Sequence, residues 1–143
     1  LKNRMSKFGL ELESSKSKII KFGKYAEQSR KQLGEGKPET FDFLGFTFYC
    51  SKTRQGKRCI KVKTSKKKFK QKVKAMKVWL YENRDIRVKE LMEKLRIKLL
   101  GHYRYYGVSH NSTMISTFRH RTLEYLFKIL NRRSTVGKAS MKC

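Results

Sequence analysis

The residue types best suited to bind a charged, ring-bearing partner are gathered in one short run between Gly101 and Gly107. Aromatic rings offer flat faces on which unpaired bases stack, at about 1–3 kcal/mol per base, and an arginine binds phosphate oxygens. A helix through this run would place Tyr103 and Tyr106 on one side and Tyr105 nearer another, so we expect one or two tyrosines to be buried. The candidate nucleic-acid contacts in the run are His102, Tyr103, Arg104, Tyr105 and Tyr106.

Charge and composition point to the same class of partner. The 143 residues include 37 Lys and Arg against 11 Asp and Glu, for a formal net charge of +26. Such a chain repels itself unless a polyanion neutralises it, which favours RNA or DNA. No apolar run approaches the ~20 residues that cross a bilayer, so no membrane partner is expected. A hydrophobic content of 38% is too high for a disordered tail, and the chain is expected to fold.

Metal chemistry is not indicated. Cys50, Cys59 and Cys143 have no C-x-x-C spacing and no matching histidine pair, which argues against a zinc site or a disulfide framework. The carboxylates are scattered, with Asp42 and Asp85 the only aspartates and no two acidic residues adjacent. We expect no metal site in this chain. The cysteine pattern also predicts a reducing compartment.

The first forty residues predict short, irregular elements. Residues 1–8 have the character of a helix end, closed by Gly9. Alternating apolar and polar residues predict two short strands, at 10–12 and 18–22. The polar stretch 23–39, with three glycines and the only proline, is typical of an exposed loop.

A β-hairpin is predicted next, from strands at 41–50 and 58–64 joined by a turn at Gln55-Gly56. Within 41–50 the apolar positions shift by one residue beside Gly45. Such a shift beside a glycine favours a β-bulge or a sharp bend, where another backbone approaches closely.

From Ser65 onward the apolar period changes from two to about 3.6, which predicts three amphipathic helices packed as a bundle. Ser65 is suited to cap the first helix, and Asn111 or Ser112 the third. The predicted core stripes are Phe69, Val73, Met76 and Leu80, then Val88, Leu91, Met92, Leu95 and Leu99, then Ile115, Phe118, Tyr125, Leu126 and Ile129. Phosphate contacts are expected on the lysine face of the first helix, at Lys66, Lys67, Lys70, Lys74 and Lys77.

Three motifs, taken in order, resemble the C-terminal part of group II intron-encoded reverse transcriptases, or maturases. They are the Gly9–Ser17 segment with its Gly-Leu-Glu-Leu start, the Gly34–Phe46 segment, and Gly101–Gly107. The resemblance covers nearly the whole chain. It implies an α+β fold in which palm-remnant strands and a primer-grip-like hairpin precede a three-helix thumb.

The resemblance also implies domain limits and site roles. Residues 1–64 correspond to the end of the palm, 65–135 to the thumb or domain X, and 136–143 to a basic tail. Phe43, Leu44 and Gly45 correspond to the primer grip, although a strand-and-bend core is the simpler alternative for these residues. Lys16 corresponds to a palm lysine suited to protonate pyrophosphate in a full-length polymerase, and is otherwise a solvated turn lysine.

The chain departs from the family in lacking the Tyr-x-Asp-Asp motif that holds two Mg²⁺ ions, which are expected only for a full-length polymerase. Two functions therefore remain open. One is the binding of group II intron RNA for splicing and of an RNA/DNA template–primer. The other is a stand-alone basic RNA- or DNA-binding module, associated with ribosomes or nucleoids. The residues indicate no dimer surface.

Overall fold

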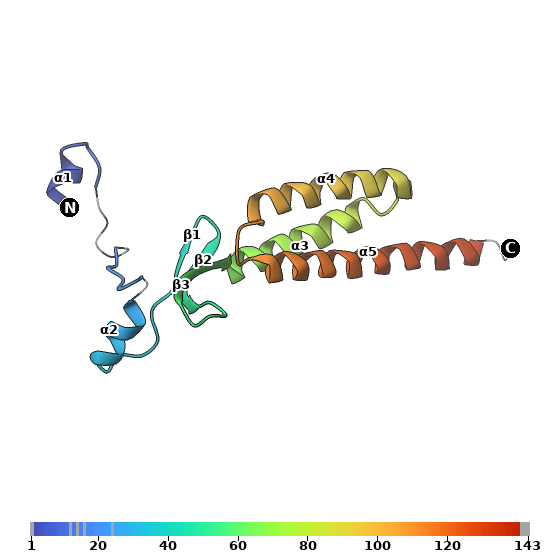
Figure 1. Cartoon of the computed structure of the whole chain (residues 1–143). Helices are drawn as coiled ribbons and strands as arrows, with labels where there is room; N and C mark the ends of the chain where they lie inside the picture. The colour runs from blue at the N-terminus through green and yellow to red at the C-terminus, as the bar shows by residue number, and fades with distance from the viewer. Residues whose placement is uncertain (1, 12, 14, 16, 24, 141–143) are drawn as a thin grey trace.

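The computed structural model describes residues 2–11, 13, 15, 17–23 and 25–140, with the backbone alone for residues 2 and 134–140. A three-stranded antiparallel sheet lies between two short N-terminal helices and three long helices that run side by side (Figure 1). The chain is thus α+β, as the sequence predicts. The elements are α1 (Lys2–Ser6), α2 (Ala26–Gln32), β1 (Phe41–Phe43), β2 (Phe46–Lys52), β3 (Arg58–Thr64), α3 (Lys66–Glu82), α4 (Val88–Tyr106) and α5 (Ser112–Ser140).

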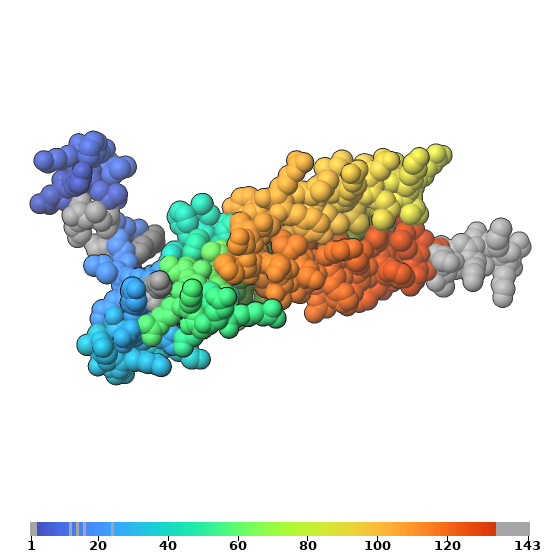
Figure 2. All heavy atoms as spheres, viewed as in Figure 1, coloured from blue at the N-terminus to red at the C-terminus, as the bar shows by residue number. Residues whose placement is uncertain are grey.

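The N-terminal region differs from its prediction in two ways. Residues described between 10 and 22 form no strand, because a short alternating segment needs a partner strand and Ile19 is 97% exposed. The segment 23–39 is not wholly a loop, since α2 forms within it and buries Ala26. The glycines and the proline that suggested a loop all flank this helix. In the space-filling view, α1 stands away from the sheet and the bundle (Figure 2).

The predicted first strand of the hairpin is in fact two strands. Leu44 and Gly45 form a tight turn with positive φ angles of 49° and 84°, and β1 and β2 pair across it. The shift in apolar parity is therefore a complete chain reversal rather than a bulge. It places four phenylalanines on one face of the sheet, because Phe41 pairs with Phe48 and Phe43 with Phe46.

The bundle core forms largely as predicted. Ser65 caps α3 by accepting a hydrogen bond from the Lys68 backbone N–H. Two predicted core residues of α4, Val88 and Met92, are instead about half exposed. Both residues lie beside the buried stripe of α4, which contacts the core through Leu91 and Leu95. The buried core consists of Met76, Leu80, Leu91, Leu95, Phe118, Leu126 and Ile129.

Two polar contacts hold the ends of the bundle. At one end Asn111, fully buried before α5, accepts a hydrogen bond from the Thr64 N–H at 2.8 Å and donates to the Thr64 hydroxyl and the Tyr106 carbonyl. At the other, Arg133 donates to the carbonyls of Ile86 and Asn83 in the α3–α4 connection. The spacing of the three helices is therefore set by contacts between residues far apart in sequence. Residues 136–140, predicted as tail, continue the backbone of α5.

Candidate nucleic-acid interface

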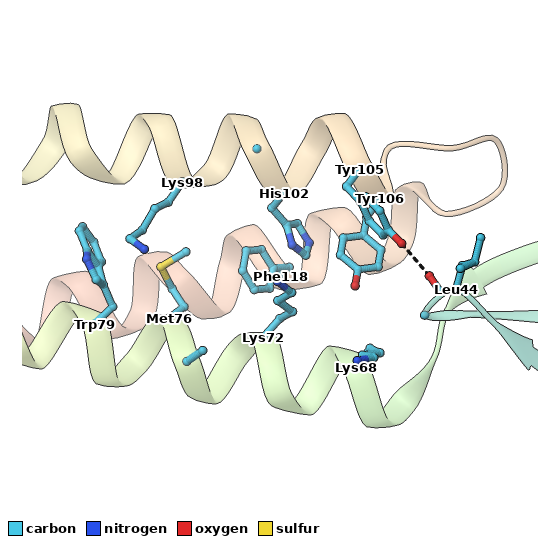
Figure 3. A pocket seen from close by; sticks show the side chains of 13 residues that line it. Leu44, Lys68, Lys72, Met76, Trp79, Lys98, His102, Tyr105, Tyr106 and Phe118 are labelled. Atoms are coloured by element: carbon cyan, nitrogen blue, oxygen red, sulfur yellow. Dashed lines mark hydrogen bonds between the residues drawn. The ribbon is translucent and has the colours of Figure 1, made fainter.

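A groove of about 860 Å³ runs between α3 and α4, with α5 beneath it and the β1–β2 turn at one end (Figure 3). It exists because α3 packs mainly on α5, and its side chains toward α4 leave space. Its lining is basic and aromatic, and no Asp or Glu of the described residues takes part. The lining residues are Leu44, Gly45, Lys68, Lys72, Ala75, Met76, Trp79, Lys98, Gly101, His102, Tyr105, Tyr106 and Phe118.

The groove residues of α3 share one face of the helix because they are spaced three or four positions apart. The groove residues at positions 68, 72, 75 and 79 lie one position before the core stripe at 69, 73, 76 and 80. In α4, Lys98 likewise precedes Leu99, which packs against the core, whereas His102 and Tyr106 line the groove themselves beside Gly101 and Tyr105. On α3, therefore, one stripe of residues faces the core and the adjacent stripe faces the groove, with Met76 contributing to both.

The lysines of α3 divide between two faces. The predicted phosphate contacts, Lys66, Lys67, Lys70, Lys74 and Lys77, are all exposed outside the groove. Lys68 and Lys72 instead line it, and Lys98 faces them from α4 (Figure 3). These three lysines were not singled out by the sequence, because lysine occurs almost all around α3.

The indole of Trp79 is a further groove residue that the sequence did not indicate. The Lys98 ammonium lies 4.9 Å from the centre of its ring, a cation–π distance. Trp79 and Lys98 thus form one end of the groove, away from the sheet (Figure 3). One feature of the sequence could have indicated the groove. Ala75 and Gly101 interrupt the large side chains of α3 and α4, and these small residues leave room between the two helices.

His102 is at the centre of the groove and is not a free surface residue. Its imidazole stacks on Phe118, with ring centres 3.8 Å apart and planes 17° apart. Burial, together with the positive charge of Lys72, lowers the pKa of His102 to about 4. The imidazole is therefore neutral near pH 7 and carries one N–H donor and one acceptor nitrogen.

The last turn of α4 attaches the sheet to the bundle through Tyr105 and Tyr106. Tyr105 remains 53% exposed, but its hydroxyl donates a hydrogen bond to the Leu44 carbonyl at 2.9 Å. Tyr106 is 4% exposed, and burial with the neighbouring Tyr105 raises the pKa of its hydroxyl. Both rings contact Phe46 of β2. The prediction that part of the tyrosine run is buried is confirmed.

The other two residues of the run lie elsewhere. Tyr103 is half-buried in a second hollow, between the end of α4 and the start of α5, that Ile115 and Arg119 also line. Arg104 is exposed. The run is thus divided among the groove, the sheet contact, the second hollow and solvent, and it does not act as one surface.

The β1–β2 turn projects its apolar side chains into solvent. Phe43 is 59% and Leu44 67% exposed, so neither belongs to a strand-and-bend core. Gly45 faces the bundle: a Cβ atom there would lie 3.3 Å from the Tyr106 hydroxyl oxygen and 3.4 Å from Cγ of Lys68. A glycine at position 45 thus suits both the φ of 84° and the close approach of the turn to Tyr106 and Lys68.

The remaining sequence predictions concern metals, thiols and membranes. Lys16 lies outside the described residues. In the described part of the chain, no three His, Cys, Asp or Glu side chains gather as a metal site requires. Cys50 and Cys59 lie on opposite faces of the sheet, because Cys50 pairs with Ile60 and Cys59 with Ser51. None of the described helices combines the length and apolar character needed to cross a bilayer.

The groove, with its three lysines and its rings, is thus a basic, ring-lined hollow in an α+β protein. Comparisons with models of protein families, with curated proteins and with solved structures found no match for the chain.

Proposed function

We propose that this chain is an RNA-binding module that forms the C-terminal part of a group II intron-encoded reverse transcriptase. In this proposal the sheet is the end of the palm with its primer grip, and the bundle is the thumb or domain X. The module holds intron RNA during splicing and a template–primer during DNA synthesis. The observation that carries the proposal is the basic, ring-lined groove between α3 and α4, closed at one end by the β1–β2 turn.

The charge distribution on α3 supports binding to structured RNA. Seven of its seventeen residues are lysines, and only Glu82 is acidic. Lysines outside the groove, such as Lys70 and Lys74, suit the phosphates of an A-form helix, which proteins bind through its backbone rather than its deep major groove. Lysines inside the groove suit a second segment of the same RNA.

The attachment of the β1–β2 turn to α4 supports a role in holding a primer. A turn that contacts a primer end must be fixed relative to the thumb, and the bond between Tyr105 and Leu44 provides that connection. Leu44 is then free to contact a sugar or base with its exposed side chain. The proposal assigns binding alone to these residues, because paired carboxylates for two Mg²⁺ ions are absent from the sequence.

The proposal is tested by comparing two RNAs of equal length, a structured group II intron domain and an unrelated structured RNA. We expect tighter binding to the intron RNA, measured by fluorescence anisotropy over a series of salt concentrations. The logarithm of the affinity should fall with the logarithm of salt, with a slope of about −0.7 to −0.9 per phosphate contact.

Equal affinity for the two RNAs would favour the stand-alone basic module instead. The variant Lys70→Gln/Lys74→Gln serves as a control for general attraction, since it should weaken binding to both RNAs to the same extent. Failure to bind either RNA at low salt would contradict both functions.

A further inference from the structure

The groove has the size of a site for one small ligand rather than for a duplex. Its volume of about 860 Å³ falls within the range of roughly 300–1,000 Å³ that is typical of small-molecule sites. Between the two helices the lining carries small residues, Ala75 on α3 and Gly101 on α4, which leave this space open. Apart from its chain neighbours and the adjacent backbone of its own helix, no heavy atom lies within 4 Å of the position that a Cβ atom on Gly101 would occupy.

Flat apolar surfaces flank this space. On one side is the indole of Trp79, and on the other the stacked pair of His102 and Phe118. Proteins bind unpaired bases by stacking them on aromatic side chains and by forming hydrogen bonds to their edges. The neutral imidazole of His102 provides both a donor and an acceptor for such an edge.

Positive charge enters the same space from both helices. Lys72 of α3 and Lys98 of α4 point into the groove, and Lys68 lines it beside the sheet (Figure 3). With three ammonium groups and no lining carboxylate among the described residues, the groove complements an anion. A phosphate attached to a planar ring combines the two features that the walls and the lysines select.

We propose that the α3–α4 groove binds a single unpaired nucleotide of the bound RNA. The base occupies the space between Ala75 and Gly101, and its phosphate contacts Lys68 and Lys72. This inference rests on one part of the proposed function, namely that the chain binds RNA. It adds that a bulged or looped-out nucleotide, rather than duplex alone, is the preferred feature.

The test uses the full chain and two RNA hairpins that differ only by one unpaired nucleotide, 2-aminopurine, in the stem. We expect about ten-fold tighter binding to the bulged hairpin, since stacking of one base supplies an effect of this order. The 2-aminopurine fluorescence should fall on binding, because stacking quenches it.

The variant Gly101→Leu fills the space without changing charge. It should fold, because the position is open and a helix interior favours leucine over glycine. We expect it to bind both hairpins with the affinity that wild type has for the paired one. Circular dichroism checks that the helix content is unchanged.

A matched pair of charge variants locates the phosphate. Lys72→Gln removes a groove lysine, and Lys70→Gln removes one from the outer face of the same helix. The first should reduce the preference for the bulged hairpin, while the second should weaken binding to both hairpins equally.

Two outcomes overturn the inference: no preference for the bulged hairpin in wild type, or an unchanged preference in Gly101→Leu. If intron RNA is still bound selectively in either case, the proposed function stands without this site. If no RNA is bound at all, both proposals fail together.

Discussion

The hydroxyl of Tyr105 in α4 donates a hydrogen bond to the backbone carbonyl of Leu44, which lies 61 positions earlier in the sequence. The same tyrosine ring stacks on Phe46, with centres 5.9 Å apart. These contacts join the β1–β2 turn to the end of the bundle beside the groove. The turn and the groove therefore form one continuous surface.

Removing the Tyr105 hydroxyl should loosen the turn without unfolding the bundle. In Tyr105→Phe the ring still stacks on Phe46, but the Leu44 carbonyl loses its donor. We expect a loss of at most about 1 kcal/mol in the free energy of unfolding and faster amide hydrogen exchange in β1 and β2. Tyr103→Phe is the control, and equal exchange in the two variants would show that the bond does not restrain the turn.

Replacing Leu44 by asparagine should stabilise the protein and weaken binding. Leu44 has φ 49°, a left-handed conformation that costs a leucine about 1–2 kcal/mol and that asparagine adopts more readily before glycine. We expect Leu44→Asn to raise the free energy of unfolding by about 0.5–1 kcal/mol in urea titrations. Template–primer affinity should fall, because the exposed leucine side chain is lost.

Leu33→Asn provides the comparison for Leu44→Asn. Leu33 is also exposed, but its φ is −91°, so asparagine relieves no left-handed strain there. A stabilisation of the same size in both variants would contradict the explanation from backbone conformation. Unchanged template–primer affinity in Leu44→Asn would contradict a contact by Leu44.

Asn111 is expected to be the most sensitive polar residue of the junction between sheet and bundle. Alanine there would leave the buried Thr64 N–H without its acceptor and would remove one of the two donors to the Tyr106 carbonyl, which keeps its bond from the Val108 N–H. We expect Asn111→Ala to lower the free energy of unfolding by about 2–4 kcal/mol. Ser116→Ala, on the exposed face of α5, should change it by less than about 0.5 kcal/mol. Similar effects of the two substitutions in urea would contradict the assignment.

The pH dependence of stability should contain a contribution from His102. Its pKa in the folded protein is about 4, below the ordinary value of 6.5, so the unfolded chain takes up the proton first as the pH falls. The stability that neutral His102 contributes is fully present above pH 6.5. It is lost as the pH falls from 6.5 to about 4, and it changes no further at lower pH. His102→Phe keeps the stacking ring and removes this dependence.

The measurement for His102 is the difference in unfolding free energy between wild type and His102→Phe from about pH 7 to about pH 4. That difference should change in favour of the variant as the pH falls. His120→Phe is the control, because His120 is exposed on α5. A difference that stays constant with pH would show that His102 is not held neutral by its surroundings.

The spacing of apolar residues was sufficient to predict a helix and its buried face where that helix packs on a single core. The stripe that begins at Phe69 predicted α3, its cap at Ser65 and its buried face, because the period of 3.6 records burial on one side of a helix. The same logic failed for residues 10–22. Alternation there predicted strands, but strands also need partners, and the sequence pattern does not specify them.

The reversal at Leu44 and Gly45 shows the limit of a pattern that left two structures open, a β-bulge or a sharp bend. The parity shift correctly located an irregularity. A bulge and a two-residue turn both shift parity, and they differ only in whether the next strand continues or returns. Pairing of Phe43 with Phe46 distinguishes the two, and that pairing is a tertiary observation.

By itself, the sequence determined that the chain is basic, that it folds as α+β, and that lysines cover the outer face of α3, because composition and helical period are properties of the chain alone. Only the tertiary structure decided that Lys72, Lys98 and His102 converge. Their distance depends on how far α3 stands from α4. That separation is set by Phe118 beneath, by Asn111 and Arg133 at the two ends, and by the small side chains between the helices.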